Sequence, residues 1–491
     1  MQQQGDGFSR IIVSALRGGS GKTLISIGII AALRKKYTIA PFKKGPDYID
    51  TGWLALAAGR PCYNLDTFLI QEEHVLQSFL SHFKNGDVAI IEGNRGLYDG
   101  LDTEGSTSTA ALAILLHSPI LLCVDCTKAT RTIAAMVLGC LQFDSRVQIK
   151  GIILNWIATH RHETLIRKSI ESHCGIPVIG AVPKLREQLF PERHMGLVPT
   201  TEHSWAKNSI HKAAELAEQY LDLDRIVDMA CKADTLSMPG IREDQSTRPV
   251  SMSNDFFLNG KERHMPFENK KPIKIGIFKD AAFSFYYPEN IEALISAGAQ
   301  PEFISPFDSG SIPEVDALYI GGGFPETHAK TLAENTTFRE QLRSLAQSGL
   351  PIYAECGGLM FLGEALVLEG VSYPMVGVFP VVFGISKQPQ GHGYTVALVE
   401  KENPYFDVGT ELRGHEFHYS HILKWKGSNK DLVFRMKRGT GFMEKKDGLC
   451  FKNVLATFTH LHALGTPSWA KAMVRNAIYS PLYHKKRGQH F

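Results

Sequence analysis

The first half of the chain alternates short apolar runs with longer segments of helical periodicity, and this alternation constrains the fold more than any other feature. We expect strands at residues 11–14, 38–42, 88–91, 120–124, 151–154 and 178–181. Helical patterns lie between them, among them 24–36, 72–83, 108–116 and 163–173. This order is typical of parallel strands with helices on both faces of a sheet. The sequence therefore predicts an α/β domain over residues 1–231.

Residues 232–271 break this pattern with turn-forming and polar residues, such as Met238-Pro-Gly and Asp244-Gln-Ser-Thr-Arg-Pro. We interpret this segment as a linker. A second α/β domain is expected over residues 272–491, beginning with an apolar run at 273–278. Two domains suit a chain of 491 residues.

The composition limits the partners and the cellular compartment that we expect for this protein. The net charge of +3 gives no reason to expect nucleic acid as a partner. No apolar run approaches the roughly 20 residues that span a bilayer, so we expect no membrane partner. Eight cysteines without a framework spacing indicate reduced thiols in the cytoplasm. Cys123 and Cys126 form a C-x-x-C within an apolar run, where core packing is the favoured interpretation. A homodimer is compatible with the sequence.

A cysteine stands between an apolar run and a helical pattern in the second half. The run at 350–354 leads to Cys356, and Gly357 and Gly358 then open an amphipathic helix. Such a turn holds a nucleophile on a strained elbow. We expect the helix N-terminus to lower the pKa of the thiol and the Gly357 amide to face a developing oxyanion. His460, at the end of a later apolar run, is the candidate base. The simpler alternative is a buried cysteine beside a glycine turn.

The segment from Arg17 to Thr23 follows the first predicted strand and opens a helix, which is the context of a P-loop. Gly19 and Gly21 allow backbone amides to wrap phosphates. Lys22 can reach the terminal phosphates, and the Thr23 hydroxyl can bind Mg²⁺. A glycine-rich turn without a nucleotide is the simpler alternative.

Acidic side chains follow the next two long strands. Asp47 and Asp50 come after the second, and Glu92 and Asp99 after the third. Ligands bind at the carboxyl ends of strands in open α/β sheets. Beside a triphosphate, these carboxylates would serve as magnesium ligands or contact substrate, although each alone could cap a loop. Asn155, near the fifth strand, is a candidate contact for the adenine edge.

Six further segments, taken with the P-loop, resemble the cobyrinate a,c-diamide synthase family. They are Gly45-Pro-Asp-Tyr-Ile-Asp50, Glu92-Gly-Asn-Arg-Gly-Leu-Tyr-Asp-Gly100, Pro191-Glu-Arg-His-Met-Gly-Leu197, Gly321-Gly-Gly-Phe-Pro-Glu326, Glu355-Cys-Gly-Gly358 and Gly414-His-Glu-Phe-His-Tyr-Ser420. The family joins a dethiobiotin-synthetase-like ATP domain to a class I (flavodoxin-like) glutamine amidotransferase domain. The P-loop itself is similar to the deviant form K-G-G-x-G-K-T, with Arg17 in place of the first lysine and Leu16 where the general pattern has glycine.

The resemblance implies a two-site ligase. L-Glutamine would be hydrolysed at Cys356 with His460 as base, and Gly322 and Gly323 would supply a second oxyanion amide beside Gly357. Ammonia would pass to the first domain. There ATP would phosphorylate a carboxylate of a corrin-type tetrapyrrole, and ammonia would displace the phosphate, at the c and the a acetate groups.

The resemblance also assigns roles near the P-loop. Tyr48 and Asp50 would contact the tetrapyrrole. Glu92 and Asp99 would lie near Mg²⁺ or the acyl phosphate, and Asp47 is expected to face the phosphates or Mg²⁺.

Two departures and two alternatives remain open. His462 stands where many triad amidotransferases have glutamate, so either the site is a Cys–His dyad or another group orients His460. The linker is also longer than the family suggests. The alternative substrates are sirohydrochlorin and Ni-sirohydrochlorin. A different class is a deviant P-loop ATPase switch with an inactive amidotransferase domain.

Overall fold

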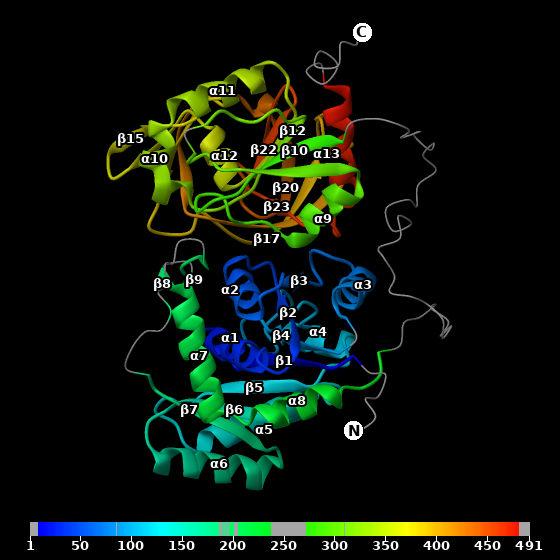
Figure 1. Ribbon diagram of the computed structural model, residues 1–491, viewed down its shortest axis with the longest axis vertical. Coiled ribbons are helices and arrows are strands. Elements are labelled where there is room, and N and C mark those ends of the chain that lie inside the picture. The colour runs from blue at the N-terminus through cyan, green and yellow to red at the C-terminus, as the bar shows by residue number, and fades with distance from the viewer. Residues whose placement is uncertain are drawn as a thin grey trace. The chain divides into compact units, whose positions relative to one another are not determined.

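The chain divides into two compact units, Met1–Ser251 and Met252–Phe491, coloured blue to green and green to red in Figure 1. The computed structural model describes residues 8–84, 86–185, 190, 192–193, 196–200, 205–236, 272–308 and 310–480. Most of the predicted linker, residues 237–271, lies outside the described residues, as do positions 191, 194 and 195 of the 191–197 motif. The remainder of that motif forms a two-stranded ribbon of β8 (Glu192–Arg193) and β9 (Gly196–Leu197).

The described part of the first unit contains a seven-stranded sheet in the order β3-β2-β4-β1-β5-β6-β7, with every neighbouring pair parallel. Six of these strands match the six predicted runs. The seventh, β3, was not predicted. The bounds are β1 (Arg10–Ala15), β2 (Thr38–Lys44), β3 (Tyr63–Leu65), β4 (Asp87–Glu92), β5 (Ile120–Asp125), β6 (Ile149–Ile157) and β7 (Val178–Pro183).

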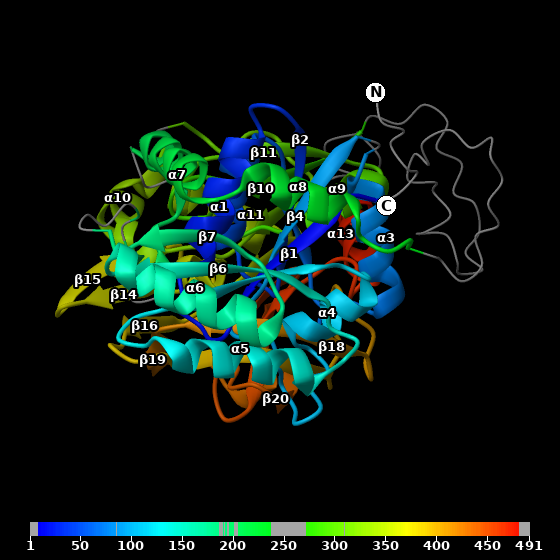
Figure 2. The same ribbon diagram turned by 90° about the horizontal axis from the view of Figure 1, so that it is seen from below.

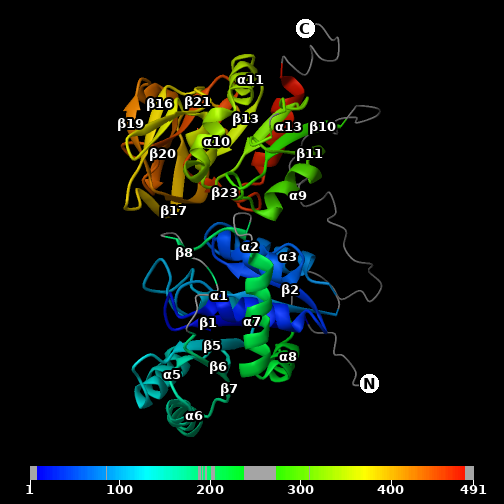
Figure 3. The ribbon, with the colours of Figure 1, turned by 60° about the vertical axis from the view of Figure 1, so that its left-hand side comes forward.

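Helices cover both faces of this sheet. Ile11 and Val13 of β1 share one core with side chains of α1, α2, α7 and α8. Figure 3 shows α7 beside α1, and Figure 2 shows β6 and β7 between α7 and α6. The bounds are α1 (Lys22–Leu33), α2 (Ile49–Ala58), α3 (Glu72–His82), α4 (Thr109–Leu115), α5 (Arg131–Phe143), α6 (His160–Cys174), α7 (Ala206–Tyr220) and α8 (Leu223–Cys231). The four predicted helices are confirmed as α1, α3, α4 and α6.

The main sheet of the second unit is parallel in one half and antiparallel in the other. Its order is β11-β10-β12-β13-β22-β21-β20-β17-β18-β23, and the pairs from β11 to β22 are the parallel ones. The bounds are β10 (Ile273–Phe278), β11 (Ala299–Ile304), β12 (Ala317–Ile320), β13 (Ile352–Glu355), β17 (Gly391–Val399), β18 (Glu411–His418), β20 (Leu432–Arg438), β21 (Lys446–Phe451), β22 (Val454–Thr457) and β23 (His460–Leu461).

A smaller sheet and several helices complete the second unit. The smaller sheet comprises β14 (Ala365–Leu368), β15 (Val371–Pro374), β16 (Val381–Ile385) and β19 (Ser420–Trp425). The helices are α9 (Pro288–Ser296), α10 (Ala329–Glu334), α11 (Thr336–Gln347), α12 (Gly357–Leu362) and α13 (Ser468–Tyr479), with 3₁₀ turns η3 (Pro325–His328) and η4 (Asn429–Asp431). Both units are therefore α/β, as predicted. Among the described residues, no helix combines the length and the apolar character that crossing a membrane requires.

Candidate active sites

The predicted P-loop connects β1 to α1. Gly19 and Gly21 adopt φ of 73° and 84°, a left-handed conformation that favours glycine. A β-carbon at Gly21 would also come within 2.3 Å of Asn155 Nδ2. Gly21 caps α1, so Lys22 and Thr23 occupy its first turn, where free backbone amides can bind an anion.

A cluster of buried charges lies beside Thr23. The Thr23 hydroxyl donates to Glu92 Oε1 at 2.8 Å, and Lys43 Nζ lies 3.1 Å from both Glu92 Oε1 and Asp50 Oδ2. The side chains of Lys43 and Glu92 are only 2% and 1% exposed. The cluster therefore joins the ends of β2 and β4 to the first turns of α1 and α2.

Lys43 was not predicted as a site residue. A lysine at a strand end usually extends into solvent, and only the fold reveals that this one is enclosed between two carboxylates. The sequence signal was its place two residues before the predicted 45–50 turn.

Burial and neighbouring charges shift the titration of this cluster. Burial raises the pKa of Glu92 above its ordinary value, and the charge of Asp50 adds to the effect although Lys43 opposes it. Burial alone would lower the pKa of Lys43, but Glu92 and Asp50 raise it well above its usual value. Burial, followed by repulsion from Lys43, lowers the pKa of Lys22. The cluster thus holds Lys43 as a cation.

The donor set at this cluster suits a hard cation. Among the described residues, Glu92 Oε2 is buried without a hydrogen-bond partner, next to the oxygen that receives the Thr23 hydroxyl. No set of three or more His, Cys, Asp or Glu side chains in the described chain is arranged to hold a metal by itself. Mg²⁺ typically takes one or two protein oxygens and completes its shell with phosphates and water. The residues therefore fit Mg²⁺ bound together with a nucleotide.

The other predicted residues of the first unit lie around the cluster in different ways. Asp47 is half-buried and accepts from Asp50 N at 2.7 Å. Burial, then the charge of Asp50, raises the pKa of Asp47. Tyr48 is the half-buried residue that precedes α2. The Asp47–Asp50 turn is thus held partly by its own side chain, and contact of Asp47 with Mg²⁺ stays a prediction.

Asp99 and Asn155 both contact backbone. The Asp99 side chain is exposed and accepts from Gly96 N at 2.8 Å, which closes the loop after β4. The buried Asn155 amide donates to Ser20 O at 2.9 Å and so braces the P-loop. A contact of Asn155 with adenine stays a prediction.

The C-x-x-C pair belongs to the core of this unit. Cys123 and Cys126 are both fully buried, and burial raises the pKa of each to about 12. The structure therefore confirms packing for these thiols.

Cys356 lies on the predicted elbow between β13 and α12. It has φ 46° and ψ −99°, a conformation that a non-glycine residue rarely adopts. Its amide donates to Thr457 O at 2.7 Å, which fixes the turn against the end of β22. The helix that follows is short and completely buried, so the expectation of an amphipathic helix was wrong.

The expected pKa of the cysteine was also wrong in direction. Burial, followed by the negative charge of Glu326, raises the pKa of Cys356 well above its usual range. The Gly357 amide does lower it, but this contribution is smaller than the cost of burying a thiolate. The side chain of Cys356 is therefore a thiol in the resting protein.

His460 packs against the predicted glycine turn. A β-carbon at Gly322 would lie 2.5 Å from His460 Cε1 and 3.3 Å from Nε2. A β-carbon at Gly357 would lie 3.1 Å from Gly323 N. The fold thus brings the elbow, the glycine turn and the histidine together, and each glycine leaves room for its neighbour.

Two carboxylates that were not assigned roles from the sequence also border this histidine segment. Glu355 Oε2 is 3.4 Å from His460 Nδ1. His462, where many triad sites have glutamate, lies 3.6 Å from Glu289 Oε1 through Nε2. The clue for Glu355 was its place directly before the cysteine.

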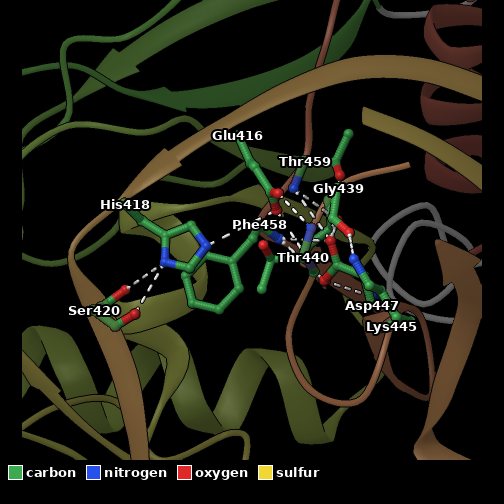
Figure 4. Close-up of polar contacts among 12 residues, drawn as sticks. Glu416, His418, Ser420, Gly439, Thr440, Lys445, Asp447, Phe458 and Thr459 are labelled. Atoms are coloured by element: carbon green, nitrogen blue, oxygen red, sulfur yellow. Dashed lines mark hydrogen bonds and ion pairs between the residues drawn. The ribbon is translucent and has the colours of Figure 1, made fainter. Parts of the chain in front are cut away.

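A third buried carboxylate, Asp447, secures the turn that precedes His460 (Figure 4). It accepts from Thr457 Oγ1 at 2.7 Å, from Phe458 N at 3.1 Å and from Thr459 N at 3.3 Å. Burial raises its pKa to about 6. Nearby, the His418 ring stacks on Phe458 at a centroid distance of 3.8 Å. His460 therefore follows a turn that buried hydrogen bonds hold in place.

Comparison with known proteins agrees with this two-part architecture. Residues 11–197 match the CobQ/CobB/MinD/ParA nucleotide binding domain, and residues 274–468 match the CobB/CobQ-like glutamine amidotransferase domain. The fold and the two matches define an ATP-dependent carbon–nitrogen ligase that takes its nitrogen from glutamine, with ATP as co-substrate.

Similar proteins share both units. Cobyrinate a,c-diamide synthase of Magnetococcus marinus is 42% identical over 95% of this chain and 96% of its own length. The proteins of that name from Archaeoglobus fulgidus and Methanobrevibacter smithii are each 37% identical, over 96% and 94% of this chain and 97% of their own lengths. The chain belongs to the cobyrinate a,c-diamide synthase family.

Proposed function

We propose that the protein converts the a and c acetate side chains of cobyrinate to amides, using ATP and nitrogen from L-glutamine. The observation that supports this most strongly is that one chain carries both a P-loop with a buried lysine–carboxylate cluster and a strained Cys356 elbow packed with His460. Whole-length similarity to proteins named for this reaction supplies the substrate. An ATPase switch with an inactive amidotransferase domain would have no use for the fitted glycine turn.

Glutamine hydrolysis begins with transfer of the Cys356 thiol proton to His460. The sulfur then forms a bond to the side-chain carbonyl carbon of glutamine, and amides at Gly357 and at the Gly322–Gly323 turn stabilise the oxyanion. As the carbon–nitrogen bond breaks, His460 returns the proton to nitrogen and ammonia leaves. Water hydrolyses the thioester to glutamate.

The ligase step makes a carboxylate reactive. The γ-phosphoryl group of ATP is transferred to an acetate oxygen of cobyrinate, and ammonia displaces phosphate from the acyl phosphate. Lys22 stabilises the phosphoryl group during its transfer. The positive charge of Lys43 balances the negative charges of Glu92 and Asp50. Thr23, Glu92 and Asp47 would hold Mg²⁺, which neutralises phosphate charge when bound.

The residues of the 45–50 turn would contact the second substrate. Tyr48 offers a ring for a flat macrocycle and a hydroxyl for an acetate arm. Asp50 is the carboxylate expected to contact this substrate, and it also joins the cluster at Lys43. Asp99 would lie near Mg²⁺ or the acyl phosphate.

Substrate comparison tests the proposal. The purified protein is incubated with ATP, Mg²⁺ and glutamine together with cobyrinate, sirohydrochlorin or Ni-sirohydrochlorin. The products are then identified by mass spectrometry. We expect two amidations of cobyrinate. Diamide formed only from a sirohydrochlorin would overturn the substrate assignment.

Two variants test the division of labour between the units. Cys356→Ser should abolish glutamine-dependent amidation and keep activity with ammonium salt. Lys22→Ala should lose activity with both nitrogen sources, by about a thousandfold or more, because phosphoryl transfer precedes attack by ammonia. Full ammonium-dependent activity in Lys22→Ala would exclude this loop as the ATP site.

A further inference from the structure

The His460 imidazole has a fully buried carboxylate on one side. Glu355 is the last residue of β13, directly before Cys356, and its side chain is 1% exposed. Its Oε2 lies 3.4 Å from His460 Nδ1, and its Oε1 accepts from Leu461 N at 3.1 Å. Tyr319 donates its hydroxyl to Oε2 at 3.3 Å. The carboxylate is therefore held in place and contacts two consecutive residues of the base segment.

The opposite edge of the His460 ring faces the glycine turn of the proposed glutamine-hydrolysing site. Cε1 and Nε2 of His460 are the atoms nearest to Gly322, in the turn that packs against Gly357. The negative charge of Glu355, 3.4 Å from Nδ1, favours the tautomer in which Nδ1 carries the hydrogen. In that tautomer Nε2 is the basic nitrogen that would take the thiol proton of Cys356. The geometry thus resembles the carboxylate–histidine half of a triad.

The second carboxylate–histidine pair has a different arrangement. His462 is 0% exposed, and its Nδ1 accepts from Leu464 N at 3.2 Å. Its Nε2 lies 3.6 Å from Glu289 Oε1. Its Nδ1 therefore contacts a backbone turn, while its Nε2 faces a carboxylate whose oxygens have no hydrogen-bond partner among the described residues. This pair provides a matched control within the same unit.

We propose that Glu355 is the positioning residue that completes the amidotransferase site, in place of a carboxylate two residues after the histidine. This inference rests on the proposed glutamine hydrolysis. The proton moves from Cys356 Sγ to His460 Nε2 and then to the departing nitrogen, and Glu355 takes no part in this transfer. The carboxylate holds the ring in the productive tautomer and stabilises the imidazolium.

The test compares Glu355→Gln, Glu355→Asp and Glu289→Gln. We expect Glu355→Gln to lower kcat for glutamine hydrolysis at least about a hundredfold, since loss of the orienting carboxylate in a serine protease triad costs about 10⁴. The KM for glutamine should stay within about threefold, because the lost contact acts on the base. Glu355→Asp keeps the negative charge, so its kcat for glutamine hydrolysis should be at least about tenfold higher than that of Glu355→Gln. Glu289→Gln should stay within about fivefold of the parent.

A second measurement separates positioning from folding. Ammonium-dependent amidation of cobyrinate should be unchanged in Glu355→Gln, because the first unit does not use this residue. Equal loss with ammonium and glutamine, full glutaminase activity in Glu355→Gln, or a larger loss in Glu289→Gln would each overturn the inference. Failure of the parent protein to amidate cobyrinate with ammonium would reject the proposed substrate, while glutamine hydrolysis would still report on Glu355.

Discussion

Gly322 lies directly against the imidazole of His460. A β-carbon at position 322 would come within 2.5 Å of His460 Cε1, closer than such atoms approach in proteins. His460 is itself 2% exposed, so the surrounding residues keep its ring from turning toward solvent. The glycine turn and the base are therefore fitted to each other.

A single methyl group at this contact should disable the base. Gly322→Ala should lower glutamine hydrolysis about a hundredfold, since a displacement of about 1 Å can cost this much, and should keep ammonium-dependent synthesis. Gly310→Ala is the control, because a β-carbon there meets nothing within 4 Å. Kinetic assays with both nitrogen sources decide. A fully active Gly322→Ala would mean that the ring is not held where the structure has it.

The buried cation of the first unit should be needed for both stability and catalysis. Lys43→Met leaves Glu92 and Asp50 without their counter-charge, which should lower the free energy of unfolding by about 3–5 kcal/mol. Lys35→Met, which breaks the exposed pair with Glu218, should cost at most about 1 kcal/mol. Calorimetry with and without Mg-ATP identifies the transition of this unit, because a bound ligand raises its midpoint. Equal midpoints for the two variants would contradict the prediction.

The reactivity of Cys356 should depend on pH as a buried thiol does. Because burial raises its pKa, the thiolate fraction of the resting protein is small at neutral pH and grows as pH rises. The rate of alkylation by iodoacetamide should therefore still increase between pH 7 and 9, as mass spectrometry of the labelled peptide would measure. The exposed Cys231 is the internal control for reagent and buffer. A plateau below pH 7 would mean that the helix amides outweigh burial.

The turn at Asp47 and Tyr48 should separate the two substrates. Tyr48→Ala should raise the KM for the tetrapyrrole or alter the ratio of mono- to diamide while nearly keeping the affinity for ATP. Asp47→Asn should slow the ATP step for either acetate group. The two KM values and the product ratio are measured for both variants. Unchanged tetrapyrrole kinetics in Tyr48→Ala would remove this turn from the substrate site.

Much of the fold could be predicted because the parallel strands are continuous apolar runs. β1, β4 and β5 are enclosed by helices, so their sequences differ sharply from the segments around them. β3 has only three residues and lies at the sheet edge, which is too short for a pattern. The fold class thus followed from periodicity, and the edge strand did not.

The properties of the candidate sites were harder to predict from the sequence where they depend on how deeply a side chain is buried. The motifs indicated the P-loop and the elbow, but the pKa of Cys356 depends on how completely the fold encloses the thiol. The carboxylate at Glu355 borders His460 only because β13 and β22 pair in parallel. Such a relationship between distant segments has no local signal.

The positions of β13 and β22 in the chain also determine when this pair can form during synthesis. β13 and β22 are neighbours in the sheet, yet β14 to β21 lie between them in the chain. A ribosome releases Cys356 long before His460, and the elbow gains its Thr457 anchor only when β22 has emerged. An unfinished or truncated chain thus carries the nucleophile without its base.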